Sequence, residues 1–116
     1  MPLNKRKAML DIYLVPSSCT AMPDDSQSLV HAGSIDLDAH RALASVFDQC
    51  RQAGVGLGYF EDTLARPDQV MTMLGVFDAH AGTLGIDDGR AAAFKTMRGM
   101  LARAAEQGAG LAAFCD

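Results

Sequence analysis

Carboxylates follow two apolar segments of this chain at matching positions, and they are the side chains best placed for chemistry. Glu61 and Asp62 come directly after the apolar residues 55–60, and Asp116 follows the apolar residues 110–115. If the two segments are neighbouring parallel strands, Asp62 and Asp116 meet at one edge of a sheet. Such an acidic patch could bind a cation, act as a general acid/base pair or contact a basic protein, whereas isolated strand-end carboxylates are only solvated.

The histidines and cysteines form no recognisable metal or catalytic motif. They are His31, His40, His80, Cys19, Cys50 and Cys115. Their spacing contains no C-x-x-C or H-E-x-x-H pattern, and no serine lies in a G-x-S-x-G turn. We therefore expect no catalytic residue, no metal and no cofactor. Asp24, Asp25 and His31 are candidate contact residues, because all three lie in a polar stretch that reads as a surface loop.

The glycine-rich stretch GVGLG at 54–58 imitates a nucleotide-binding loop but has the wrong order of elements. Phosphate-binding glycines follow a strand and open a helix, whose N-terminal amides then hold the anion. Here the glycines follow a predicted helix and open a predicted strand. The pattern therefore favours a structural joint over a nucleotide site.

The same joint occurs twice in the chain. Residues 39–62 align without a gap on residues 93–116, and the alignment pairs glycine with glycine at both joints. We predict two helix–glycine–strand units, in which the first glycine ends the helix with a positive φ angle and the second thins one face of the strand. The structural glycines of the two units are Gly54, Gly56, Gly108 and Gly110.

Apolar periodicity predicts the remaining elements. Residues 9–15 alternate apolar and polar side chains, which is typical of a strand with one buried face near the edge of a sheet. Apolar residues then recur at helical spacing in three segments. The predicted helices run from about Asp36 to Gly54, from Pro67 to Gly82 and from Asp88 to Gln107. Residues 16–35 read as a long polar loop, in which 28–33 is a candidate edge strand.

These elements follow the order β-α-β-α-α-β, which predicts an α/β (or α+β) domain with a small sheet of three or four strands and helices packed on it. Helical crossovers favour at least partly parallel pairing. The segments 55–60 and 110–115 are apolar on both faces, so we expect them at the centre of the sheet. We expect residues 1–8 to form a flexible tail and 9–116 to form a single domain. Pairing across a homodimer would cover the sheet edges.

Composition narrows the function classes. A chain of 116 residues with 49% hydrophobic and 21% charged residues is typical of one soluble domain. The net charge of −4 argues against nucleic acid and anionic membranes and favours a basic partner. No segment approaches the roughly 20 apolar residues of a membrane span. Three cysteines without a disulfide pattern favour a reducing cytoplasm.

Together these patterns favour a small non-enzymatic protein that acts by protein–protein contact, of which a cognate inhibitor or immunity-type protein is one specific version. The alternative is a small enzyme or metal-dependent ligand binder that uses the strand-end carboxylates. The two hypotheses differ in geometry. An enzyme needs its carboxylates to converge in one pocket, whereas an interaction protein needs only an exposed patch.

Overall fold

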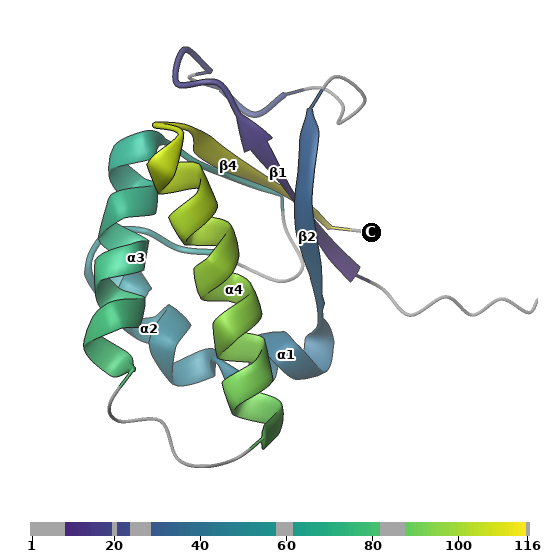
Figure 1. Ribbon diagram of the computed structural model, residues 1–116, viewed down its shortest axis with the longest axis vertical. Helices are drawn as coiled ribbons and strands as arrows, with labels where there is room; N and C mark the ends of the chain where they lie inside the picture. The colour runs from purple at the N-terminus through teal and green to yellow at the C-terminus, as the bar shows by residue number, and fades with distance from the viewer. Residues whose placement is uncertain (1–8, 20, 24–28, 58–61, 82–87, 116) are drawn as a thin grey trace, which may run out of the picture.

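A four-stranded sheet with helices gathered on one side makes up the fold (Figure 1), as the computed structural model shows. The structure describes residues 9–19, 21–23, 29–57, 62–81 and 88–115, with the backbone alone at 88–90. The elements in chain order are β1 (Met9–Val15), β2 (Val30–Asp36), α1 (Leu37–Ala42), α2 (Ala44–Gln52), β3 (Thr63–Ala65), α3 (Pro67–His80), α4 (Asp88–Glu106) and β4 (Gly110–Cys115). The predicted mixed class of helices and a small sheet is confirmed.

The sheet has the strand order β2-β1-β4-β3, and every neighbouring pair is antiparallel. The expectation of partly parallel pairing was therefore wrong. One connecting helix would return the chain to the end of the sheet where the previous strand began, and the next strand would then run parallel to it. Here two helices, α3 and α4, connect β3 to β4. Two antiparallel helices return the chain to the end where β3 stops, so Ala65 pairs with Leu111 at the start of β4.

Two strand positions also differ from the prediction. The strand at 9–15 is β1, which lies between β2 and β4 rather than near an edge. The candidate edge strand at 28–33 is present as β2 and is longer, so residues 30–35 are not loop. Of the predicted strand at 55–60, Val55–Leu57 is not a strand, 58–60 lie outside the described residues, and pairing to β4 begins at Thr63.

The helix predicted from Asp36 to Gly54 is divided into α1 and α2 at Leu43, whose backbone leaves the helical region at φ −101° and ψ 15°. The predicted start is confirmed, because the Asp36 carboxylate accepts a hydrogen bond from the Ala39 N–H at 2.8 Å. The break at the fully buried Leu43 lets α1 pack on α4 while α2 packs on α3.

Both predicted glycine joints end a helix in the same way. Gly54 has φ 95° and Gly108 has φ 63°, which are the positive angles that the prediction required. In each joint the glycine N–H bonds to a carbonyl three residues earlier, and the following N–H bonds to a carbonyl five residues earlier. This is the Schellman arrangement that satisfies the last carbonyls of a helix. A strand follows directly only after Gly108.

The second glycines of the two units differ in what surrounds them. A Cβ at Gly110 would lie 2.5 Å from the carbonyl oxygen of Ala65 and 3.1 Å from a methyl group of Val15. The absence of a side chain at Gly110 therefore makes room for the end of β3. A Cβ at Gly56 would meet nothing within 4 Å.

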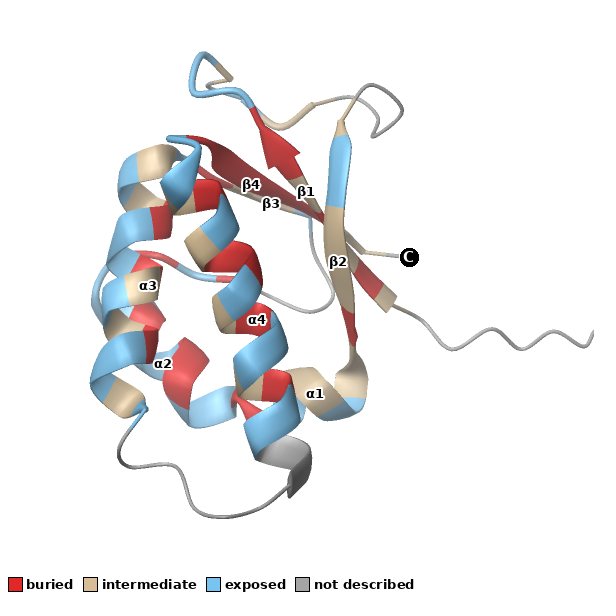
Figure 2. Cartoon of the chain, in the orientation of Figure 1, coloured by how far each residue is buried: buried red, intermediate tan, exposed pale blue. Residues whose placement is uncertain are grey.

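The core lies between the sheet and the helices, whose buried residues are coloured red in Figure 2. On the sheet it begins with Leu10, Ile12 and Leu14 of β1, which alternate with less buried neighbours as the sequence predicted. Gly33 of β2 leaves room for the side chain of Met100, whose sulfur would lie 2.8 Å from a Cβ there. The largest fully buried side chains on the helices are Leu43, Val46, Phe47, Val70, Met73, Phe77, Met97 and Leu101.

Burial also fixes the protonation of Cys50, which has no exposed surface and lies in this core. Burial raises the pKa of the Cys50 thiol from 9.0 to about 11. In the unfolded chain the thiol ionises near its ordinary pKa, so the neutral thiol contributes stability below about pH 9 that is lost as pH rises toward 11. We expect the free energy of unfolding to fall by about 2–3 kcal/mol across this window, since one pKa unit corresponds to about 1.4 kcal/mol.

The Cys50→Ala variant is the control for this pH dependence. It keeps every tyrosine, lysine and other cysteine that titrates in the same range, so urea unfolding of both proteins at pH 8 and at pH 11 isolates the Cys50 thiol. The variant should start less stable and then lose less stability than the wild type. Equal losses in the two proteins would show that Cys50 ionises freely in the folded state.

Candidate functional site

Asp62, the described member of the predicted acidic patch, lies where β3 and β4 meet. Its Oδ1 accepts a hydrogen bond from the Cys115 N–H at 2.9 Å, which places it beside the last residue of β4. Antiparallel pairing is responsible, because it brings the start of β3 to the end of β4. Glu61 and Asp116 lie outside the described residues. The Asp62 carboxylate therefore caps a strand end, and this use is structural.

Some of the remaining predicted residues lie within the described part of the chain, and others lie outside it. Asp24 and Asp25 lie outside the described residues. His31 lies on β2, not in a loop, and its side chain is 51% exposed. His40 on α1 has its Nε2 2.9 Å from the Leu57 carbonyl oxygen and stacks its ring on Phe47 with centroids 4.6 Å apart.

The residues that the structure brings together most closely lie on the helix-free face of the sheet, where β1 and β2 pair. We call Asp11, Tyr13, His31 and Ser34 the β1–β2 cluster. Register places them on one face, because Asp11 pairs with Ser34 and Tyr13 pairs with His31. A shift in register between Ile12 and Tyr13 adds a residue to β2 and allows both pairs to share that face.

Hydrogen bonds hold the polar part of the β1–β2 cluster. The Ser34 hydroxyl donates to Asp11 Oδ1 at 2.6 Å. The Nε2 atom of His31 lies 3.2 Å from Ser34 Oγ and 3.8 Å from Asp11 Oδ1. Because the serine proton points to Asp11, the imidazole Nε2 is the donor to Ser34 Oγ in this arrangement.

The order of these three groups does not match that of a serine hydrolase. In a Ser-His-Asp triad the histidine lies between the other two groups and accepts the serine proton. In the β1–β2 cluster the serine lies in the middle and gives its hydrogen bond to the carboxylate. The arrangement positions the Asp11 carboxylate instead of activating Ser34.

Aromatic rings extend the β1–β2 cluster across the sheet. The ring of Tyr13 meets the ring of His31 edge to face with centroids 5.0 Å apart, and meets the ring of Phe114 on β4 in the same manner at 5.5 Å. Edge-to-face contacts of this kind stabilise a fixed ring orientation. The result is a row of three rings over β2, β1 and β4, beside one carboxylate.

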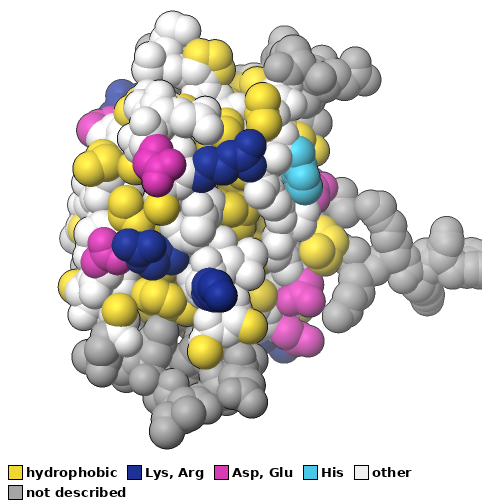
Figure 3. Space-filling model, viewed as in Figure 1, with side chains coloured by type: hydrophobic (Ala, Val, Ile, Leu, Met, Phe, Trp, Pro, Cys, Tyr) yellow, Lys and Arg dark blue, Asp and Glu magenta, His cyan; other side chains and the backbone are white. Residues whose placement is uncertain are grey.

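The charged side chains are distributed unequally between the two layers. None of the four strands contains a lysine or an arginine, while β1 carries Asp11 and β2 carries Asp36. The described lysine and arginine side chains lie on the helices or at their ends, and several of them are visible in Figure 3. Three of these arginines pair with acids on the helices themselves: Arg51 with Asp48, Arg66 with Asp68 and Arg98 with Asp78.

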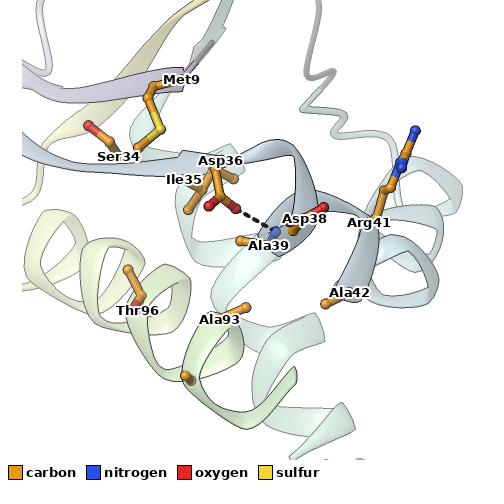
Figure 4. Close-up of a pocket in the computed structure, with 11 residues that line it drawn as sticks. Met9, Ser34, Ile35, Asp36, Asp38, Ala39, Arg41, Ala42, Ala93 and Thr96 are labelled. Atoms are coloured by element: carbon orange, nitrogen blue, oxygen red, sulfur yellow. Dashed lines mark hydrogen bonds between the residues drawn. The ribbon is translucent and has the colours of Figure 1, made fainter. Parts of the chain in front are cut away.

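A cleft of about 640 Å³ lies on the other side of β2, between the strand end, α1 and α4 (Figure 4). Its walls include small or apolar side chains such as Ala39, Ala93 and Met9. The Asp36 carboxylate at its edge is the helix cap, as the dashed line in Figure 4 shows. The lining contains no histidine or cysteine, and its two acids are Asp36 and Asp38.

Comparison of this chain with protein-family models, curated proteins and solved structures finds no significant match. Among the described side chains, no three His, Cys, Asp or Glu lie close enough together to hold a metal ion. No described helix combines the length and apolar character needed to cross a membrane. The function must therefore be argued from the geometry of the site.

One part of the β1–β2 cluster could have been found from the sequence. Asp11 is an acid in the middle of an otherwise apolar strand, and period-two alternation puts it on the same face as Tyr13. The sequence placed His31 in a loop, and no serine of the chain lies in a nucleophile motif. The approach of Ser34 and His31 to Asp11 depends on pairing across 23 residues of sequence, which no local pattern specifies.

Proposed function

We propose that this protein acts by binding other proteins rather than by catalysis, and that β2 is its principal contact edge. One observation carries the proposal. β2 is an edge strand of seven residues without lysine or proline, and its Val30 is 54% exposed. An edge strand of this kind is a template for pairing with another chain, and charged residues and proline are the usual protection against it. The opposite edge, β3, has only three residues.

The proposed first partner is a second copy of the chain. Two β2 strands that pair about a two-fold axis would join the two sheets into one and cover both long edges. The bulge opposite Ile12 and Tyr13 bends β2, so the pairing would use one half of the strand rather than its full length. In this proposal the protein is a homodimer that works in the cytoplasm, where its three free cysteines stay reduced.

Sedimentation analysis of wild-type protein and two lysine variants tests the dimer. Val30→Lys places a charge on the β2 edge and should shift the equilibrium to monomer. Met71→Lys is the matched control, since Met71 is 57% exposed but lies on α3, and it should leave the dimer intact. A wild-type protein that stays monomeric at its solubility limit contradicts the proposal, as does equal dissociation of both variants.

A basic protein is the proposed second kind of partner, and a cognate inhibitor is one specific form of this role. The charge distribution supports it, because the strands carry two acids and no lysine or arginine. The competing enzyme hypothesis needs strand-end carboxylates with atoms available for chemistry. Asp62 caps the Cys115 N–H with one carboxylate oxygen, which gives this carboxylate a structural role at the strand end.

A further inference from the structure

We propose that Asp11 and the aromatic rings beside it bind an arginine side chain of a protein partner on the helix-free face of the sheet. This inference rests on the proposed function in one respect, because it takes the partner to be a protein. It adds the chemical group that is recognised and the residues that recognise it. It also moves the basic contact from the strand-end carboxylates to the middle of the sheet.

The Asp11 carboxylate is held in place but retains an oxygen for a ligand. Ser34 at 2.6 Å and His31 at 3.8 Å both approach Oδ1, and among the described residues neither the hydrogen bond nor the ion pair of Asp11 uses Oδ2. The side chain is 31% exposed, so a ligand can reach it. Because the Ser34 bond already fixes the carboxylate, a partner group that donates to Oδ2 meets a preorganised acceptor and immobilises little additional side chain. A charged donor to a carboxylate forms one of the stronger classes of hydrogen bond.

The rings select the shape of the charged group. Tyr13 is clamped between His31 and Phe114 by the two edge-to-face contacts, so the rings present a fixed aromatic surface beside Asp11. A guanidinium is planar and can lie on an aromatic ring while it donates hydrogen bonds from its edge. A lysine ammonium is a compact, strongly hydrated charge and uses such a surface less well. The combination of one carboxylate with fixed rings therefore favours arginine.

Charge favours a basic protein over a nucleic acid as the occupant of this face. Nucleic-acid surfaces require lysine and arginine to neutralise phosphates, and the strands contain neither. On the helices, three arginines are already paired with neighbouring acids. Asp11 has Ser34 and His31 as partners but no lysine or arginine among the described residues. The helix-free face thus presents an acid that a partner's arginine can neutralise.

Nuclear magnetic resonance titration of the isotope-labelled protein tests the site. The probes are a hexa-arginine peptide, a hexa-lysine peptide and N-acetylarginine amide, the last of which separates a free small ligand from a peptide-borne side chain. We expect the arginine peptide to shift the amide signals of Asp11, Tyr13, His31 and Ser34. The lysine peptide should bind more weakly, and the small amide should shift the same signals at higher concentration.

Two isosteric variants make the test specific. Asp11→Asn keeps an oxygen for the Ser34 hydrogen bond and removes the charge, and it should weaken binding of the arginine peptide by about tenfold or more. Asp68→Asn removes the same charge from α3, where the Asp68 side chain is 79% exposed, and should change the affinity by no more than about twofold. An unchanged amide spectrum would show that each variant is folded.

Several results would overturn the inference. They are no binding of the arginine peptide, equal weakening by the two variants, signal changes confined to the acidic residues of the helices, and binding of a single-stranded oligonucleotide at the same amides. The result is separable from the dimer. If the protein is a dimer but Asp11→Asn binds the arginine peptide as tightly as the wild type, only the arginine site is disproved. If the protein is a monomer but binds the arginine peptide through Asp11, only the pairing of β2 strands is disproved.

Discussion

Replacing Gly110 with valine is expected to lower the free energy of unfolding by about 3 kcal/mol or more, enough to leave much of a small domain unfolded. The first atom of any side chain at this position would lie 2.5 Å from the Ala65 carbonyl oxygen and 3.4 Å from the Arg66 Cα. Both neighbours are backbone atoms at the end of β3 and the start of α3. Neither can rotate away, so the strand pair itself must separate.

The companion variant for this measurement is Gly56→Val. A Cβ at Gly56 meets no atom within 4 Å, and the residue does not have a positive φ angle. We expect its free energy of unfolding to stay within about 0.5 kcal/mol of the wild type. Urea unfolding followed by circular dichroism compares the two directly. If Gly110→Val is as stable as Gly56→Val, then β3 does not approach β4 as closely as the structure indicates.

Truncation of Phe77 to alanine is expected to lower the free energy of unfolding by about 3–5 kcal/mol. Phe77 has no exposed surface and lies at the centre of the helical layer. Its ring centroid is 5.9 Å from that of Phe47 on α2 and 5.2 Å from that of Phe94 on α4. Its removal would leave a cavity bounded by all three helices, which cannot collapse without moving one of them.

Two further variants test whether the loss of stability comes from the buried Phe77 ring or from any substitution on α3. Met71→Ala changes a side chain that is 57% exposed on the same helix, and it should have an effect within about 0.5 kcal/mol. Phe77→Leu refills most of the cavity and should restore a large part of the lost stability. The idea that Phe77 joins the helices fails if Phe77→Ala and Met71→Ala unfold at the same urea concentration.

The features that could be predicted from sequence are those that depend on a few neighbouring residues. The helix starts at Asp36 and Pro67 follow from local capping and from the fixed φ of proline. The joints at Gly54 and Gly108 follow from hydrogen bonds that span only five residues. Burial of alternate residues in β1 follows from the two-residue period of a strand.

The strand prediction at 55–60 shows where local pattern misleads. Val55 and Leu57 are buried, as the alternation required, yet they are not paired in the sheet. The Leu57 carbonyl lies within hydrogen-bond distance of the His40 side chain, so a side chain takes the place of a neighbouring strand there. Alternating burial occurs both in a paired strand and in an extended segment that no strand pairs with. The two differ in the partner that bonds to the backbone, and here that partner is His40 on α1.

What the sequence by itself determined is therefore the set of local elements, the two glycine joints, and the presence of Asp11 and Tyr13 on one face of β1. Tertiary structure alone decided that the strands are antiparallel, that Asp62 caps Cys115 across 53 residues, and that His31 and Ser34 join Asp11. The physical reason is how far apart in the sequence the interacting residues lie. Caps and turns form within one segment, whereas strand order depends on how the helices pack and on loop closures whose entropy changes only slowly with loop length. Of the carboxylates that looked most suited to chemistry, Asp62 became a strand cap, and the single acid inside β1 became the candidate binding site.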